Sequence, residues 1–240
     1  MNAPVFQPLY QQIKALITQS LISGEWGPGD VMPSEMELAV RFGVSQGTTR
    51  KAIDELAAEN IVVRRQGKGT FVATHAEQTV KLRFLRLVAA DGSKEPLDNK
   101  LLDCVRSKAS SYIAKLLNIK PGSAVIEIRR LLLFSGQPQI LDRIILPAAP
   151  FKGVTAERIE EYNGSMYRMY ETILGLRMVR AEERLTAVGA EAEVADVLDI
   201  DRGVPLLSIE RVSYTYGDKP MEWRLGLCLT GSHHYLNHLE

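Results

Sequence analysis

Hydrophobic residues in the first part of the chain recur every three to four positions, which is the spacing of one buried face of an α-helix. In the segment 8–23 this face consists of Leu9, Ile13, Leu16, Ile17 and Ile22. Pro8 opens the segment and Gly24 follows it, and these residue types are common at the start and just past the end of helices. The pattern predicts a helix over residues 8–23.

Two shorter helices are predicted next. Ser34 and Glu37 have the S-x-x-E spacing of a capping box, which predicts a short helix that begins after Ser34. Gly43 then supplies a turn, and Ser45 can cap a second helix that runs to about Glu59. Two helices separated by a short glycine-containing turn are typical of a helix-turn-helix motif.

A hairpin is predicted directly after the second helix. Residues 61–65 (IVVRR) and 70–72 (TFV) contain residue types that are common in strands, and the glycine-rich turn 66–69 separates them. This order of strand, turn and strand favours a β-hairpin. A hairpin in this place is called a wing.

The remainder of the chain has the pattern of an antiparallel sheet with a few helices. Strands are predicted near 80–90, 101–106, 124–134, 139–146, 177–187, 205–215 and 220–229. Helices are predicted near 109–118, 155–161, 165–174 and 190–198, and Ser165 could cap the third of them. Adjacent strands in long runs favour a sheet with helices packed on it, so the predicted fold class is α+β. We expect a winged helix-turn-helix domain at 1–74, a polar linker at 75–80 and a second domain at 81–240.

Charge changes this picture only locally. The 240 residues carry 29 Lys and Arg and 29 Asp and Glu, so the formal net charge is zero. Residues 41–75, however, contain six basic and three acidic residues, a local excess of three positive charges. A local patch is enough to attract phosphate, because screening confines its field to a Debye length of about 8 Å.

The residues that could bind metals give a weak signal. Cys104 and Cys228 are not in a CxxC arrangement, so neither a disulfide framework nor a thiolate site is indicated. His233, His234 and His238 have no carboxylate or cysteine close in sequence, and we favour a solvated terminal cluster. No segment is apolar over the ~18 residues that span a bilayer, and no signal peptide is recognised. We expect a cytoplasmic protein without a metal or cofactor.

Candidate DNA contacts follow from the helix-turn-helix pattern. The second helix of such a motif presents its N-terminal residues to base edges in the major groove, and here these are Gln46, Gly47, Thr48, Thr49 and Arg50. Gln pairs with adenine and Arg with guanine, while a helix start such as Ser45 can hold a phosphate. Further candidates for backbone or minor-groove contacts are Arg41, Gly67, Lys68 and Gly69.

The stretch GDVMPSEMELAVRFGVSQGTTRKAIDELAAENIVVRRQGKGTFVA resembles the winged helix-turn-helix of the GntR family of bacterial transcription factors. The match covers residues 28–73, and many spaced positions agree together. The resemblance implies DNA-facing positions for Ser34, Glu35, Arg41, Ser45, Thr48, Arg50, Gly67 and Gly69. Thr49 replaces a usual aliphatic residue and Gly47 is unusual for the family, which leaves the base preference open.

Residues 80–236 resemble the UTRA ligand-binding domain of the HutC subgroup, most clearly in SSYIAKLLNIKPGSAVIEIRRLLLFSGQPQILDRIILP at 110–147. The resemblance implies a fold shared with chorismate lyase and a pocket for a small acidic or sugar-phosphate-like effector. The candidate effector-binding residues are Arg83, Arg86, Arg130, Asp142, Ser165, Tyr167 and Glu222. Arginine binds carboxylate or phosphate bidentately. Leu132 stands where a second arginine is common in the family.

Several of these assignments have a simpler alternative. Arg130 and Asp142 could form a cross-strand ion pair on a solvated sheet face, which contributes about 0.2–1 kcal/mol. Glu35 could act only through its charge at a helix N-terminus. Arg50 could pair with Asp54 one helical turn later.

The predicted function is a homodimeric transcriptional regulator, a repressor whose affinity for double-stranded operator DNA is controlled by a small anionic metabolite. The alternative is a lyase-type enzyme that acts on a small aromatic or carboxylic acid through the C-terminal domain. The sequence contains no Ser-His-Asp or Cys-His arrangement in a recognisable setting and no convincing metal-ligand spacing. We therefore favour the regulator over the enzyme.

Overall fold

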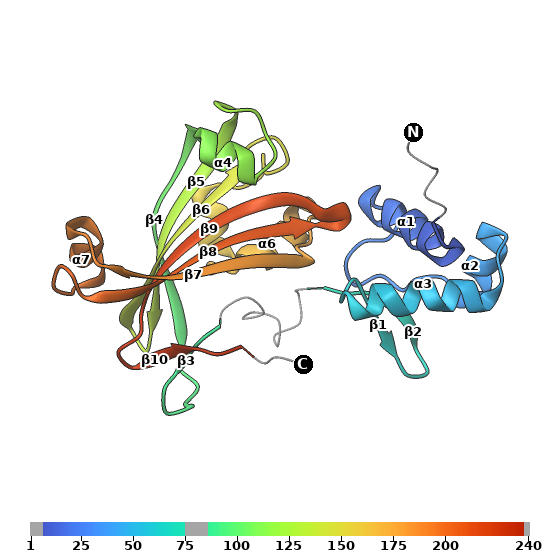
Figure 1. Ribbon diagram of the computed structural model, residues 1–240, viewed down its shortest axis with the longest axis horizontal. Coiled ribbons are helices and arrows are strands. Elements are labelled where there is room, and N and C mark those ends of the chain that lie inside the picture. The colour runs from blue at the N-terminus through green and yellow to red at the C-terminus, as the bar shows by residue number, and fades with distance from the viewer. Residues whose placement is uncertain (1–6, 75–85, 238–240) are drawn as a thin grey trace.

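The N-terminal part of the chain is a helical unit with a hairpin. The structure, a computed structural model, describes residues 7–74 and 86–237 (Figure 1). Its first elements are α1 (Leu9–Ile22), α2 (Glu35–Phe42), α3 (Gln46–Ala58), β1 (Val62–Arg65) and β2 (Gly69–Val72). β1 and β2 pair antiparallel. The predicted helices and wing are confirmed, with ends within one or two residues.

Local hydrogen bonds explain where the helices begin and end. The amide of Glu37 donates to Oγ of Ser34 and the amide of Ser34 donates to the carboxylate of Glu37, which completes the predicted capping box. Gly43 ends α2 with a φ of 64°, a left-handed conformation that favours glycine. Oγ of Ser45 accepts from the amide of Thr48 and caps α3.

Apolar faces of the three helices and the hairpin form one core. It contains Ile17 of α1, Leu38 of α2 and Leu56 of α3, each fully buried. Tyr216, which is far away in sequence, belongs to the same core. Burial of these faces stabilises helices that would be marginal alone, because isolated helices of this length are weakly stable in water.

The second domain is built on an antiparallel sheet. Its elements are β3 (Leu87–Ala89), β4 (Leu97–Lys108), α4 (Ser111–Leu116), β5 (Ala124–Phe134), β6 (Gln137–Pro147), α5 (Ala156–Glu161), α6 (Met166–Leu174), β7 (Arg180–Gly189), α7 (Ala192–Leu198), β8 (Pro205–Thr215), the 3-10 turn η2 (Tyr216–Asp218), β9 (Lys219–Leu229) and β10 (His233–Tyr235). Six strands pair in the order β4-β5-β6-β9-β8-β7, and β10 pairs with β3. The α+β fold class is confirmed.

Alternation along the strands decides which residues share a face of the sheet. On one face, Ile128 of β5 and Ile144 of β6 pack against Met169 of α6. On the other face, Val125 and Trp223 pack with α4, and a separate cluster forms with α7. We call the face that packs against α5 and α6 the α5–α6 face. Every second residue of β5, β6 and β9 points to it, and the pocket described below lies on it.

Some sequence predictions need correction or lie outside the described residues. Ser165 occupies the position before α6, but its side chain makes no capping hydrogen bond. The strand predicted at 80–90 is described only from residue 86, where β3 is short, and the predicted linker falls in the undescribed segment. The domain limits therefore stay a prediction. None of the described helices is long and apolar enough to cross a membrane.

Candidate nucleic-acid interface and ligand pocket

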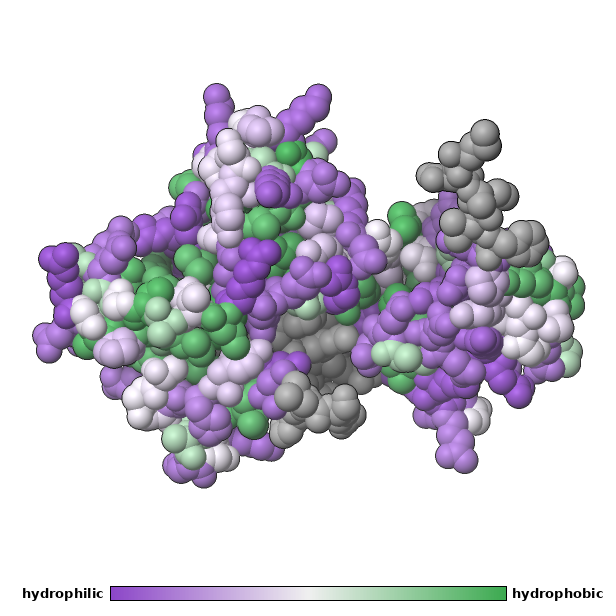
Figure 2. Space-filling model, in the orientation of Figure 1, coloured by the Kyte–Doolittle hydropathy of each residue, from purple (hydrophilic) through white to green (hydrophobic). Residues whose placement is uncertain are grey.

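The start of α2, the start of α3 and the wing enclose one groove. Residues that line it include Ser34, Glu35, Gln46, Arg50, Arg64, Gly67, Lys68 and Gly69. Most of the candidate DNA contacts therefore share one surface, although they come from separate elements. Figure 2 shows the wing as a hydrophilic projection of this domain, at the lower right.

The carboxylate of Glu35 holds two arginines at this groove. It accepts from Nε of Arg50 at 2.9 Å and from Nη2 of Arg64 at 2.8 Å. Arg64 also lies 2.7 Å from Asp54. Asp54 thus pairs with the wing arginine, whereas Arg50 pairs with Glu35. Arg64 was not predicted from the sequence, because its partners are 10 to 29 positions away.

Thr49 is a correction to the predicted DNA contacts. Its side chain is fully buried, and within the described residues its hydroxyl has no hydrogen-bond partner. Thr49, Ala52, Ile53 and Leu56 form the inward face of α3 at helical spacing. A residue on this face cannot reach DNA, whereas Gln46 and Arg50 lie on the outer face.

Arg41 lies apart from the groove. Its guanidinium forms an ion pair with Glu25 and lies over the rings of Trp26 and Phe42, with ring centroids 5.3 and 5.4 Å from Cζ. Through its hydrogen bonds Arg41 lowers the pKa of the Glu25 carboxyl to about 2. The structure gives Arg41 a role at the end of α2, and a phosphate contact stays a prediction.

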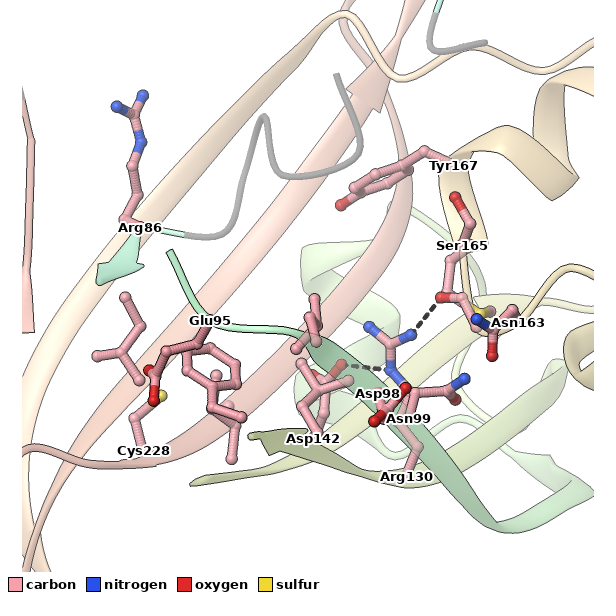
Figure 3. Close-up of a pocket in the computed structure, with 18 of the residues that line it drawn as sticks. Arg86, Glu95, Asp98, Asn99, Arg130, Asp142, Asn163, Ser165, Tyr167 and Cys228 are labelled. Atoms are coloured by element: carbon pink, nitrogen blue, oxygen red, sulfur yellow. Dashed lines mark hydrogen bonds and ion pairs between the residues drawn. The ribbon is translucent and has the colours of Figure 1, made fainter. Parts of the chain in front are cut away.

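The second candidate site is a cavity of about 980 Å³ on the α5–α6 face of the sheet. Strands β5, β6, β8 and β9 form its floor, and the segments before α6 and around β3 form its walls (Figure 3). The register explains the floor, because Arg130 lies opposite Asp142 and Asp142 lies opposite Gly226. The β5–β6 hairpin and strand β9, which is distant from it in sequence, thus meet at this part of the floor.

Arg130 is held rigidly at this floor. Its side chain is 6% exposed, and its Nε donates to Asp142 at 2.8 Å. Its Nη1 donates to the carbonyl oxygen of Gly164, in the turn before α6, at 2.6 Å (Figure 3). Gly164 has a φ of 65°, and a Cβ there would overlap the side chain of Asn99, so this position needs glycine. The predicted pair is confirmed, but it is buried and not on a solvated face.

The remaining nitrogen of Arg130 is available to a ligand. Within the described residues, Nη2 has no protein partner, because Nε and Nη1 make the two bonds of this side chain. A guanidinium nitrogen that is fixed in this way can donate to an oxyanion without further loss of side-chain freedom.

Glu222 is a further correction. It is fully buried and does not line the cavity. Its carboxylate accepts from the hydroxyls of Tyr167 at 2.7 Å and Tyr170 at 3.0 Å, and lies 3.1 Å from Nη2 of Arg224. Burial raises the pKa of both tyrosines, and the charge of Glu222 raises it further. Glu222 thus positions Tyr167 and Arg224 from behind.

Two further arginines of the pocket are not among the residues predicted from the sequence. Arg211 of β8 and Arg224 of β9 line the cavity beside Arg130. Arg224 lies 3.6 Å from Asp142. Burial alone would raise the pKa of Asp142, but the charges of Arg224 and Arg130 outweigh it and hold the pKa below its usual value. The signal was present, since these residues follow the same two-residue alternation as Arg130.

The other predicted pocket residues differ in position. Ser165 and Tyr167 line the cavity. Arg86 also lines it, but its guanidinium points away from Arg130 (Figure 3). Arg83 lies outside the described residues.

The floor of the cavity away from Tyr167 carries apolar side chains, and Glu95 and Arg86 lie at the same end (Figure 3). The apolar residues include Phe134, Ile140, Ile209 and Cys228. Burial raises the pKa of the Cys228 thiol to about 12, so this thiol is neutral. The floor of the pocket therefore combines charged residues around Arg130 with an apolar patch around Phe134 and Cys228.

The expected solvated histidine cluster is wrong for His233. It is 6% exposed, and its Nε2 lies 2.6 Å from a carboxylate oxygen of Glu95. β10 places it beside Phe134, with ring centroids 5.1 Å apart. Among the described residues no group of three metal-binding side chains is found.

A winged helix-turn-helix domain joined to a domain with an internal ligand pocket defines the class of effector-controlled transcriptional regulators. The family model for the UTRA domain matches residues 94–234, and the model for bacterial regulatory proteins of the gntR family matches residues 9–72. The chain belongs to the GntR family and carries a UTRA domain. Since members of this family are transcriptional regulators, the enzyme alternative is set aside.

Individual relatives agree with this placement. The chain is 31% identical to the uncharacterised regulator YurK of Bacillus subtilis, over 93% of this chain and 92% of YurK. It is 26% identical to a probable fructoselysine utilisation operon repressor of Escherichia coli, over 90% and 88% of the two chains. The ligand-binding domain of a Bordetella bronchiseptica protein described as a GntR-family regulator superposes with a TM-score of 0.64 at 40% identity, and covers 66% of this chain and 98% of that domain.

The charge on Asp142 should make stability depend on pH. The pKa of Asp142 is lower in the folded protein than its usual value of 3.8. The carboxylate therefore stabilises the folded state at any pH above 3.8, and this contribution is lost as the pH falls through the pKa of the folded state. Asp142→Asn removes the carboxylate that compensates the buried Arg130 and lies beside Arg224, and should cost about 3–5 kcal/mol near neutral pH. In urea unfolding, the deficit should shrink as the pH falls below 3.8.

Glu160→Gln, at an exposed position of α5, is the control. It should unfold like the unmodified protein at each pH. A deficit for Asp142→Asn that stays constant with pH would contradict the assignment of a stabilising Asp142 carboxylate.

Proposed function

We propose that this regulator is a homodimeric repressor that binds its operator through the α3–wing groove and releases it when a small anionic metabolite occupies the UTRA pocket. The observation that carries the proposal is Arg130, a buried arginine with two nitrogens fixed by protein and a third directed to the cavity. The DNA-binding half rests on the groove that gathers Gln46, Arg50 and Lys68.

Charge supports an anionic effector. The residues that line the cavity include six basic and four acidic side chains, an excess of two positive charges. The apolar patch of the floor around Phe134 and Ile209 suits a less polar part of the same molecule. From the charge of the lining, we propose a small organic compound with an anionic group as the class of effector.

For the DNA surface, we propose that Arg50 and Gln46 read base edges and that Lys68 and Ser45 contact phosphates. Glu35 would then act through Arg50 and Arg64, because a carboxylate repels phosphate and its two oxygens already hold these guanidiniums. Such preorganisation reduces the side-chain entropy that is lost on binding.

The apolar surface of the sheet beside α7 supports dimerisation. Leu133, Leu227 and Leu229 are only partly buried there, and Figure 2 shows hydrophobic surface between α7 and the middle of this domain. Helix-turn-helix regulators bind two half-sites about one helical turn apart. A second copy of the chain is therefore the occupant that we propose for this surface.

Arg50→Ala tests the DNA assignment. In a gel shift with DNA from upstream of its own gene, the variant should lose about 1–3 kcal/mol of specific binding and discriminate less against random DNA. Lys68→Ala should weaken binding to both DNAs and reduce the salt slope by about one. Arg106→Ala, on exposed strand β4, is the control. If Arg50→Ala binds both DNAs as the unmodified protein does, the groove is not the reading surface.

Arg130→Lys tests the effector assignment. Lysine keeps the charge but cannot make the fixed fork of hydrogen bonds, so a metabolite that binds here should bind at least ~10-fold more weakly. A panel of small carboxylates and phosphate esters is screened by thermal shift and by release of operator DNA. Arg158→Lys, at an exposed position of α5, is the matched control. An unchanged response in Arg130→Lys would place the effector elsewhere.

Leu229→Glu tests the dimer surface. A charge at this partly buried position should make the protein monomeric at micromolar concentration in sedimentation experiments, because an unpaired charge cannot be buried in an apolar interface. Leu16→Glu, which changes a 44% exposed residue of α1, is the control and should leave the dimer intact. A dimer that survives Leu229→Glu would argue for a different interface.

A further inference from the structure

The two domains share a small hydrophobic contact. Tyr216, in the turn between β8 and β9, is 7% exposed and lies in the core of the DNA-binding domain. Val179, just before β7, packs against the same core. In Figure 1 the β8–β9 turn points toward α1, and α1 and η2 are in contact. The UTRA sheet therefore completes the core of the neighbouring domain.

A buried arginine joins the same two domains by hydrogen bonds. Arg177, which follows α6, is 1% exposed. Its Nη2 donates to the carbonyl oxygen of Asn60 at 2.9 Å and its Nη1 to that of Ile61 at 3.5 Å. These carbonyls lie directly past the end of the recognition helix α3, where Asn60 has a φ of 55°. A positive charge at a helix C-terminus is favourable because it faces the negative end of the helix dipole.

Glu171 of α6 is the partner of this arginine. Its carboxylate lies 3.5 Å from Nε of Arg177 and accepts from the hydroxyl of Thr74 at 2.8 Å. The side chains of the two charged residues are 1% and 4% exposed. Thr74 belongs to the DNA-binding side of the chain, directly after the wing, so Glu171 contacts both domains.

The opposite end of α6 begins in the ligand pocket. Ser165 and Tyr167 line the cavity, and the carbonyl of Gly164 binds Arg130. Tyr167 and Glu171 are one helical turn apart on the same side of this short helix. A ligand that moves Arg130 or Tyr167 therefore acts on the helix that holds the Glu171–Arg177 pair.

We propose that α6 transmits pocket occupancy to the recognition helix through the Glu171–Arg177 pair, with Arg177 as the positioning residue for the end of α3. The proposal rests on the pocket assigned above as the effector site. A buried pair suits this task because a small displacement leaves charge uncompensated in the interior, which is costly, so the contact has two states and no gradual range.

The test is a double-mutant cycle on the full chain, read by amide hydrogen exchange at Asn60 and Ile61. Both amides bond within the end of α3, to Ala57 and Leu56. Tyr167→Phe removes the hydroxyl that donates to Glu222 in the pocket. If α6 couples the sites, this change should raise exchange at the end of α3 by about fivefold or more.

The same change is then made in a protein without the pair. Glu171→Leu with Arg177→Met replaces both charges by apolar side chains, so neither charge is left unpaired, and the hydrogen bonds to Asn60, Ile61 and Thr74 are lost. In that background Tyr167→Phe should have no further effect on Asn60 and Ile61. In Arg158→Met, a matched arginine removal at the surface of α5, the full effect should remain. An equal effect of Tyr167→Phe in all three backgrounds, or no effect in any, overturns the proposal.

Operator binding is measured in parallel and separates this proposal from the proposed function. In one outcome the unmodified protein fails to bind the operator while the effect of Tyr167→Phe on exchange still depends on the Glu171–Arg177 pair. That result would reject the DNA assignment and retain the coupling through α6. Specific operator binding with additive exchange effects would retain the regulator and reject the coupling. A compound found in the thermal-shift screen whose binding depends on Arg130, and which also raises amide exchange at Ile61, would support both the effector site and the coupling through α6.

Discussion

Buried charge is the constraint on which the effector domain depends. Asp142 and Glu222 are removed from water on the floor and rear of the pocket, and each is stable there only because arginines and tyrosines compensate it. Compensation fixes the positions of Arg130 and Arg224, and through Gly164 it also fixes the turn before α6. The pocket is therefore a consequence of how the sheet satisfies its own buried groups.

The same requirement recurs between the domains. Arg177 is buried at their junction and is bound by Glu171 and by carbonyls at the end of α3. Tyr216 supplies the apolar part of that junction. Since α6 starts at the pocket and ends at the junction, one short helix belongs to both charge networks. In a regulator controlled by a small molecule the pocket and the DNA-binding domain are coupled, and α6 contacts both.

The groove between α2, α3 and the wing follows a related principle at the surface. Glu35 places Arg50 and Arg64 from two different elements beside each other, in contact with water. Exposed pairs contribute little to stability, so their value lies in orientation. Thr49, one residue before Arg50, is buried on the opposite face of α3, so neighbouring positions of this helix serve the core and the exposed groove.

The sequence alone determined the elements and the family. Capping residues such as Ser34 and Ser45, turn glycines such as Gly43 and the alternation in β5, β6 and β9 are local signals, and they predicted helices and strands near their observed places. Arg130 and Asp142 were found in the same way. Only the tertiary structure decided that Glu222 lies behind the pocket, that Arg64 lies at the groove beside Arg50 and that Arg177 is buried between the domains. Their partners come from strands and helices far away in sequence, and such pairings depend on register and on packing between domains, which no local pattern records.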